Sequence, residues 1–250
     1  MKASLNYQAL KNGTPVSDAL VVEVPVQLFI EGEPLTVSMC TPIHIREWAF
    51  GILFTEGIIR SAEQVHSYSE EEVDHQITIR VSLNNASQAI TNKRSLLSVS
   101  ACGICGKTAF EPAASRIDDE LRSLTLREDI AKMMVQLREV QTLFEETGGC
   151  HAAGVFNSER QLIFASEDIG RHNAVDKVIG HLLLNNQLRS AKYIVVSGRV
   201  SYEIVAKCFA AGIPNLAAVS SPSSLAVDYA KELGLSLFAF CRENRVTQYA

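Results

Sequence analysis

The sequence lacks several features that would assign it to a class of protein directly. No apolar run reaches the roughly 18 residues of a membrane-spanning helix, and residues 1–7 lack the apolar core of a signal peptide. Internal repeats and low-complexity tracts are absent. Basic residues do not gather into the dense face that nucleic-acid binding usually needs. We therefore expect a compact cytoplasmic protein that binds neither a membrane nor nucleic acid.

A disulfide framework is also missing. The six cysteines are spaced irregularly along 250 residues, unlike the cysteines of small secreted scaffolds. A reducing cytoplasm fits this pattern, and thiols kept reduced there are available for chemistry.

Charge is distributed unevenly along the chain. Residues 1–150 hold 20 acidic and 13 basic side chains, whereas residues 151–250 hold 8 and 10. The acidic runs at 69–74 and 118–120 predict solvated loops. The weakly positive second part suits a small anionic ligand rather than nucleic acid.

The pattern of apolar residues divides the chain in two. Before residue 145 it predicts a strand hairpin at 21–40, a helix at 43–56, a strand at 76–83 and a second helix at 126–144. After residue 145 it predicts a hairpin (152–156 with 162–165) and then alternating helices and strands: 173–184, 192–197, 201–211, 215–219, 223–233 and 236–240. This alternation implies parallel strands with helices on the sheet faces. The predicted fold class is α/β, with a smaller α+β N-terminal portion (1–144) before an α/β domain (145–250).

The loops after the predicted strands carry residues suited to an anion. In an open parallel sheet, ligands bind beyond the carboxyl ends of the strands. Glycines, hydroxyl residues and arginines there offer backbone N–H groups and bidentate donors. They are Arg171, His172, Ser197, Gly198, Arg199, the serines of 220–224, and the segment 241–245. They predict a phosphate-bearing or polyanionic ligand. In the alternative interpretation, Ser201 and Ser223 only cap helices, the arginines are solvated, and His172 makes a helix-start hydrogen bond.

The most informative motif is the pair Cys102 and Cys105, separated by Gly103 and Ile104. Such a pair serves as half a zinc site, a redox disulfide or a relay for a sulfur atom. The absence of a second Cys-x-x-Cys and of a nearby His-x-His leaves all three uses open. A sulfur relay needs an exposed thiol that ionises near neutral pH. The flanking glycines and Lys107 favour such a thiol. In a sulfur relay, Cys102 would carry the sulfur atom, and Cys105 would resolve the persulfide or share the sulfur.

The remaining cysteines are expected to serve packing rather than chemistry. Cys208 falls in the middle of a predicted helix, and Cys40, Cys150 and Cys241 are better explained as packing residues. The single tryptophan, Trp48, is predicted to belong to the core.

Several segments together resemble the FdhD family, the sulfurtransferases needed to make formate dehydrogenase active. They lie at 23–26, 39–42, 53–57, 100–106, 147–153, 167–177, 197–201 and 223–227. The resemblance implies a cytoplasmic homodimer whose C-terminal αβα domain is like that of cytidine deaminases, with a mostly parallel sheet. It implies transfer of sulfur from a cysteine desulfurase to the molybdenum bis(molybdopterin guanine dinucleotide) cofactor before its insertion into formate dehydrogenase. The family's cofactor-binding segment matches Phe240, Cys241, Arg242, Glu243, Asn244 and Arg245.

The likeness to deaminases extends to the expected fold but not to the chemistry. A zinc deaminase needs a His-x-Glu motif and a downstream Pro-Cys-x-x-Cys. Here His151 is followed by Ala152 and Ala153, and the Cys-x-x-Cys lies upstream. Ala153 has no group that moves a proton, so deamination is not expected. With a single Cys-x-x-Cys, we also predict no structural metal.

Two other classes of function remain as alternatives. A thiol–disulfide oxidoreductase would use the same cysteine pair, although the pair does not open the helix of a βαβ unit as in thioredoxin-like folds. A non-catalytic chaperone would bind and deliver the molybdenum cofactor without passing sulfur.

Overall fold

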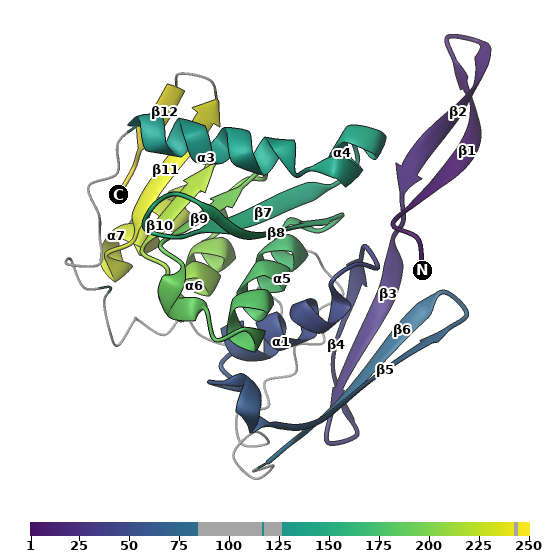
Figure 1. The fold of residues 1–250 in the computed structure, drawn as a ribbon, viewed down its shortest axis with the longest axis horizontal. Helices are drawn as coiled ribbons and strands as arrows, with labels where there is room; N and C mark the ends of the chain where they lie inside the picture. Colours follow the sequence, from purple (N-terminus) through teal and green to yellow (C-terminus); the bar gives the residue numbers. More distant parts are fainter. Residues whose placement is uncertain (85–116, 118–126, 243–244) are drawn as a thin grey trace.

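The computed structural model describes residues 1–84, 117, 127–242 and 245–250 (Figure 1). The helices are α1 (Ile45–Thr55), α3 (Arg127–Glu139), α4 (Thr142–Thr147), α5 (Arg171–Leu184), α6 (Tyr202–Ala210) and α7 (Ser224–Leu233), with short 3₁₀ turns at Ala62–Gln64 and Leu188–Ser190. The strands are β1 (Ser4–Lys11), β2 (Thr14–Val21), β3 (Val24–Ile30), β4 (Glu33–Cys40), β5 (Val65–Val73), β6 (Gln76–Leu83), β7 (His151–Phe156), β8 (Leu162–Asp168), β9 (Tyr193–Val196), β10 (Asn215–Ala218), β11 (Ser236–Arg242) and β12 (Arg245–Gln248).

In the described part of the chain, the strands form three sheets. β1 and β2 pair alone, the second sheet has the order β4-β3-β6-β5, and the third has the order β12-β11-β10-β9-β7-β8. β9, β10 and β11 pair in parallel, as predicted, but β7, β8 and β12 add antiparallel pairs. The six-stranded sheet is therefore mixed, where a mostly parallel sheet was expected. Hairpins such as β7–β8 and β11–β12 are joined by connections too short for a parallel crossover.

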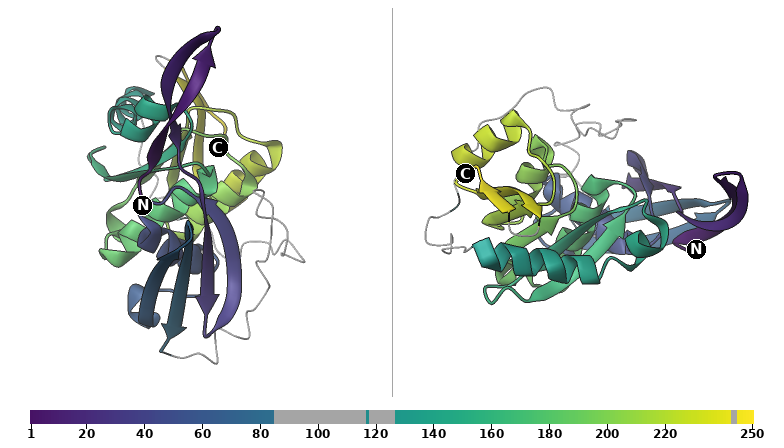
Figure 2. Two further views of the ribbon diagram at one scale, coloured as in Figure 1. Left: turned by 90° about the vertical axis from the view of Figure 1, so that its right-hand side faces the viewer. Right: turned by 90° about the horizontal axis from the view of Figure 1, so that it is seen from above.

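Helices cover both faces of the six-stranded sheet (Figures 1 and 2). The apolar side of α3 packs on one face, and α5, α6 and α7 pack on the other. On the far side of α5 lies α1, which buries Trp48 and Leu53 against the four-stranded sheet. The α/β class is confirmed by this layering, and the specific likeness to cytidine deaminases stays a prediction. The proposed boundary at residues 144 and 145 also stays a prediction, although α3 before it packs on the six-stranded sheet.

Two glycines allow α1 and α5 to approach closely. A Cβ atom at Gly51 would overlap the carbonyl oxygen of Asp176, and one at Gly180 would overlap that of Glu47. Only glycine therefore fits at these two points of the helix crossing. The crossing joins the layer of the four-stranded sheet to the layer of the six-stranded sheet.

Two predicted elements differ from the observed ones. The helix expected over 126–144 is divided into α3 and α4, because the Glu167 carboxylate accepts hydrogen bonds from the first-turn N–H groups of Leu143 and Phe144, both at 2.8 Å. The acidic run at 69–74, expected to be a loop, lies largely in β5, an exposed edge strand. Charged side chains suit such a strand because they oppose pairing with another chain. The other acidic run, 118–120, lies outside the described residues.

The β1–β2 hairpin was not predicted. It projects from the rest of the molecule (Figures 1 and 2), and Leu10 near its tip is 72% exposed. Asn12 and Gly13, both with positive φ, form its two-residue turn. Asn-Gly is a strong hairpin signal that was available in the sequence.

No helix within the described ranges is both long and apolar enough to cross a membrane.

Candidate functional site

The topology brings the predicted loops to one edge of the six-stranded sheet. β8, β9, β10 and β11 run in the same direction, so their carboxyl ends lie along that edge. β7 runs the opposite way, so its first residue, His151, lies at the same edge and pairs with Asp168 at the end of β8. The predicted placement of the strand-end loops is therefore correct, and the amino end of β7 joins them.

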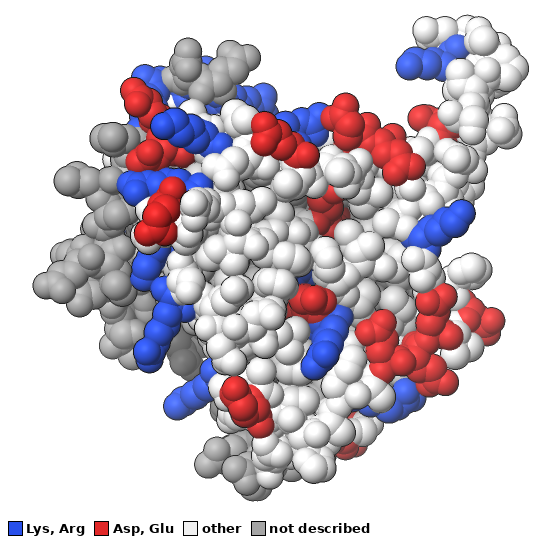
Figure 3. All heavy atoms as spheres, viewed as in Figure 1, with Lys and Arg blue, Asp and Glu red and all other residues white. Residues whose placement is uncertain are grey.

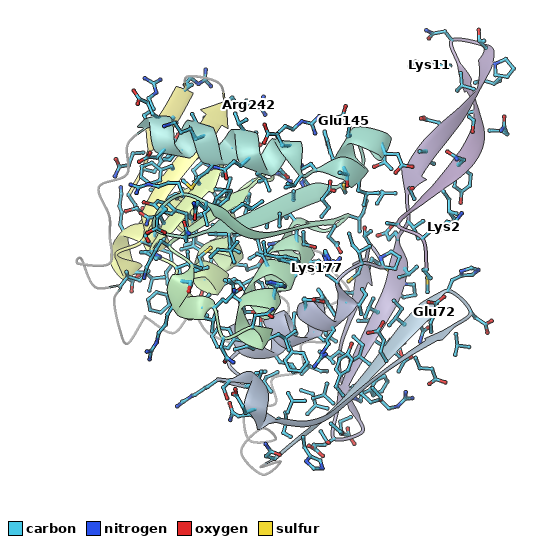
Figure 4. The ribbon with its side chains drawn as sticks, in the orientation of Figure 1. Lys2, Lys11, Glu72, Glu145, Lys177 and Arg242 are labelled. Carbon is cyan, nitrogen blue, oxygen red and sulfur yellow. The ribbon has the colours of Figure 1, made fainter. Side chains whose placement is uncertain are left out.

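A cavity of about 1190 Å³ lies between this edge and α3. Its wall includes Lys132 and Arg138 of α3, residues 148–150 of the loop before β7, and His151, Ser197, Cys241 and Arg242 of the sheet edge. Figure 4 shows Arg242 beside α3, at the end of β11. Of the described residues that line the cavity, three are basic and one, Glu139, is acidic. This balance favours an anionic ligand.

Three of the predicted binding residues line the cavity: Ser197, Cys241 and Arg242. The Ser197 hydroxyl accepts a hydrogen bond of 2.9 Å from the backbone N–H of Ala152, which fixes the end of β9 beside β7. Cys241 is 2% exposed. Of these three, Arg242 is the residue with charge to offer a ligand.

Arg171, Gly198 and Arg199 do not line the cavity but lie near His151, which does. A Cβ atom at Gly198 would stand 3.3 Å from the Arg171 Cβ and 3.4 Å from the His151 Nδ1. Burial, followed by the charges of Arg171 and Arg199, lowers the pKa of His151, against a smaller raising effect of Asp168. The Nε atom of Arg171 is buried and has no hydrogen-bond partner within the described residues.

His172 is held by the protein itself. Its Nε2 lies 3.1 Å from the Ser201 Oγ and 2.9 Å from the Glu203 Oε2, which connects the start of α5 to the start of α6. Both contacts use the same ring nitrogen, so they do not form the proton relay of a serine hydrolase. Ser201 stands at the amino end of α6 without capping it. Ser223 does cap α7, by accepting a hydrogen bond from the Ala226 N–H.

The predicted segment 240–245 contributes to the cavity only in part. Cys241 and Arg242 line it, whereas Phe240 and Arg245 do not. The guanidinium of Arg245 lies over the Phe240 ring instead, 5.9 Å from its centre. Glu243 and Asn244 lie outside the described residues.

The motif at 167–177 is largely a buried polar network. The Lys177 Nζ lies 2.6 Å from the Asp168 carboxylate, and both side chains are fully buried. Asp168 also accepts hydrogen bonds from the N–H of Thr41 and the amide of Asn173, whose oxygen accepts one from the Trp48 indole. Figure 4 shows Lys177 in the interior. These contacts tie the β8–α5 connection to the β4–α1 connection and fix the sheet edge in place.

Glu167, the first residue of that motif, supports the cavity wall. Besides capping α4, its carboxylate accepts a hydrogen bond of 3.3 Å from the Cys150 thiol. It thereby holds α4 and the loop 148–150 against the sheet.

The cysteines of the described part of the chain are all buried. Burial, with help from Glu167, raises the pKa of Cys150 to about 12, and burial raises that of Cys241 to about 11. Burial also raises the pKa of Cys40 and Cys208 above the ordinary value. Since the thiolate is the nucleophile, a raised pKa disfavours reaction of these thiols at neutral pH, as expected for packing residues. Cys102 and Cys105 lie outside the described residues.

Residues 1–84, 117, 127–242 and 245–250 contain no group of three His, Cys, Asp or Glu side chains that could hold a metal ion. The prediction of no structural metal stays a prediction, because the Cys102 pair is outside these ranges.

Sequence reasoning missed His151, Lys132 and Arg138 as residues of the cavity. His151 was noted only as part of a motif, because its place at the edge depends on β7 running antiparallel. Lys132 and Arg138 lie on α3, which was predicted only as a helix, without a place relative to the strand-end loops.

Comparison with known proteins gives a consistent result. The model of the FdhD/NarQ family matches residues 21–250. A protein of Mycolicibacterium paratuberculosis named sulfur carrier protein FdhD is 40% identical over 246 residues, which cover 93% of this chain and 90% of the relative. A protein of the same name from Saccharolobus solfataricus is 38% identical, with coverage of 93% and 89%.

A solved structure shows the same fold. It is the crystal structure of a protein from Desulfotalea psychrophila assigned as a formate dehydrogenase accessory protein. The TM-score is 0.74 at 24% sequence identity, over 99% of this chain and 96% of the other. With a family match over residues 21–250 and relatives that are similar along nearly their whole length, the chain belongs to the FdhD/NarQ family.

Proposed function

We propose that this protein is a sulfur carrier that acts as a sulfurtransferase. It accepts sulfur from a cysteine desulfurase as a persulfide on Cys102 and passes it to the molybdenum bis(molybdopterin guanine dinucleotide) cofactor before this enters formate dehydrogenase. The names of its relatives, which are called sulfur carriers, support the role in sulfur transfer. In this proposal the protein works in the cytoplasm as a homodimer.

The observation that carries the proposal is the state of the other cysteines. Cys40, Cys150, Cys208 and Cys241 are buried, with raised pKa values. Of the six cysteines in the sequence, this leaves Cys102 and Cys105 to act as nucleophiles. Two glycines and Lys107 surround the pair in sequence, and a positive neighbour favours the thiolate.

The chemistry needs both thiols. The Cys102 thiolate attacks the outer sulfur of the donor persulfide, and the donor cysteine leaves as a thiolate. When the Cys105 thiolate then attacks the Cys102 sulfur, a disulfide forms and the outer sulfur leaves at the oxidation level of sulfide. Reduction of the disulfide would return the protein to its starting state.

The cavity at the sheet edge is the proposed site for the cofactor, which is the substrate here. Its volume of about 1190 Å³ exceeds the roughly 300–1,000 Å³ of ordinary small-molecule pockets, as a dinucleotide requires. Arg242, Lys132 and Arg138 supply positive charge to the phosphates. Arg171 and Arg199 stand close behind His151 and extend the positive region.

Activation of formate dehydrogenase tests the proposal. In a strain that depends on this protein, Cys102→Ala should abolish activation, because it removes the thiol that is proposed to accept sulfur from the donor. Cys208→Ala is the matched control, since it removes a buried thiol of α6 outside the cavity. Circular dichroism should show the same fold in both variants.

The alternatives predict other results. A cofactor chaperone that passes no sulfur would keep full activity with alanine at both 102 and 105. A thiol–disulfide oxidoreductase would lose activity in the variants, but the wild type would carry no extra sulfur after incubation with a desulfurase and cysteine. Full activity of Cys102→Ala would exclude the carrier role of that residue.

A further inference from the structure

His151 lines the cavity, and its imidazole ring has no hydrogen-bond partner among the described residues. It is the first residue of β7 and is partly buried, and its backbone pairs in the β7–β8 hairpin. A partly buried ring without a described partner can hydrogen-bond a ligand that enters the cavity.

Charged groups surround this ring from several elements. Arg171 and His172 at the start of α5 and Arg199 after β9 disfavour its protonation, whereas Asp168 at the end of β8 favours it. Across the cavity wall lie Arg242 of β11 and three charged residues of α3: Lys132, Arg138 and Glu139. Positive charge therefore dominates, and with burial it lowers the pKa of His151 from 6.5, so the ring is neutral in the free protein near neutral pH.

An arginine near His151 has a donor that the described structure does not use. The Nε atom of Arg171 is buried without a hydrogen-bond partner in the described residues. A Cβ atom at Gly198 would lie 3.3 Å from the Arg171 Cβ and 3.4 Å from the His151 Nδ1, so both side chains border this glycine. An anion bound at the imidazole would therefore lie in the field of the Arg171 charge.

We propose that the cavity binds its phosphate-bearing ligand together with a proton, which His151 takes from solvent to become a charged donor to a phosphate oxygen. The proposal rests on the cavity being the ligand site of the proposed function, and it adds the protonation state at which that ligand is held. The anion offsets the repulsion from Arg171 and Arg199, so the imidazolium becomes the favoured form only in the complex.

The direction of the pH dependence follows from linkage. Burial and the neighbouring positive charges lower the pKa of His151 from 6.5 in the free protein, and in the proposal the bound anion raises it. Between the two values, binding takes up a proton and becomes tighter as the pH falls, by up to about tenfold per pH unit. Above the pKa of the complex, binding is weaker and independent of this group.

Calorimetry with GDP-mannose tests the proposal. Its diphosphate is esterified at both ends, so the charge of the ligand itself does not change near neutral pH. Titrations at one pH in two buffers with different ionisation enthalpies give the number of protons taken up. We expect uptake approaching about one proton within the pH window of linkage, and its loss in His151→Gln.

His181→Gln is the matched control. His181 also has a pKa lowered by burial, but its ring stacks on Phe164 at 3.7 Å and does not line the cavity. This variant should take up as many protons as the wild type. Binding without proton uptake, or equal uptake in His151→Gln, would overturn the inference and leave the proposed function intact. Absence of any binding would overturn the inference and the assignment of the cavity together.

Discussion

Two groups of polar residues at the same sheet edge differ in how far their hydrogen bonds are satisfied. In the interior, Asp168, Asn173 and Lys177 bond to each other and to Thr41. A few residues away, Arg171 has a buried Nε without a described partner, and the His151 ring has no hydrogen-bond partner among the described residues. The first group is satisfied within the described structure, whereas the second group has polar atoms that are not. In the proposed function, residues adjacent in one motif therefore serve folding and binding separately.

Surface charge is also uneven. Figure 3 shows acidic side chains gathered over α4 and over the β5–β6 hairpin, whereas α3 carries charges of both signs. Of the described residues that line the cavity, three are basic and one is acidic. The negative net charge of the chain therefore does not extend to the proposed ligand site.

The largest effect is expected from breaking the satisfied network. Lys177→Met leaves the Asp168 carboxylate buried without its cation, which should lower the free energy of unfolding by about 3–5 kcal/mol. Denaturant unfolding followed by circular dichroism measures this. Lys231→Met, on the exposed side of α7, should change stability by less than about 0.5 kcal/mol. If the two variants were equally stable, the interior network would not be essential to the fold.

A smaller effect, on binding and not on stability, is expected at the cavity. Arg242→Ala should weaken the affinity for guanosine diphosphate by roughly 1.5–3 kcal/mol, the value of a hydrogen bond to a charged group. Arg199→Ala, which removes a charge behind His151, should weaken it in the same range. Binding should also weaken as salt rises, because charges at a partly open edge are screened.

Arg189→Ala is the control for these variants, because Arg189 is an exposed residue of a 3₁₀ turn outside the cavity. Calorimetry at low salt compares all three. Unchanged affinity in both Arg242→Ala and Arg199→Ala would place the nucleotide elsewhere and remove the distinction between the two groups of residues.

The sequence was sufficient to predict the elements whose patterns are strong. β6 begins and ends where its alternation does, and the helices and parallel strands after residue 170 lie within a few residues of their predicted bounds. This placed Ser197 and Arg242 at a common edge correctly, since carboxyl ends of parallel strands must meet.

Other parts of the site depend on contacts between distant segments. His151 reaches the edge because β7 is antiparallel to β9, and α3 adds Lys132 because it covers that face of the sheet. The loop 167–173 was predicted from its composition to contact a ligand, but its Asp168 forms a buried ion pair with Lys177. Composition alone does not distinguish a buried ion pair from a binding residue, because both need the same charged groups.

The central claim, that Cys102 carries sulfur, is tested most directly by mass spectrometry of the intact protein. After incubation with a cysteine desulfurase and cysteine, the wild type should gain about 32 Da, the mass of one sulfur atom held as a persulfide. A reductant should remove the gain, and Cys102→Ala should lack it, whereas Cys208→Ala should keep it because that thiol is buried with a raised pKa. A wild type without the added mass, or a Cys102→Ala variant that retains it, would contradict the account.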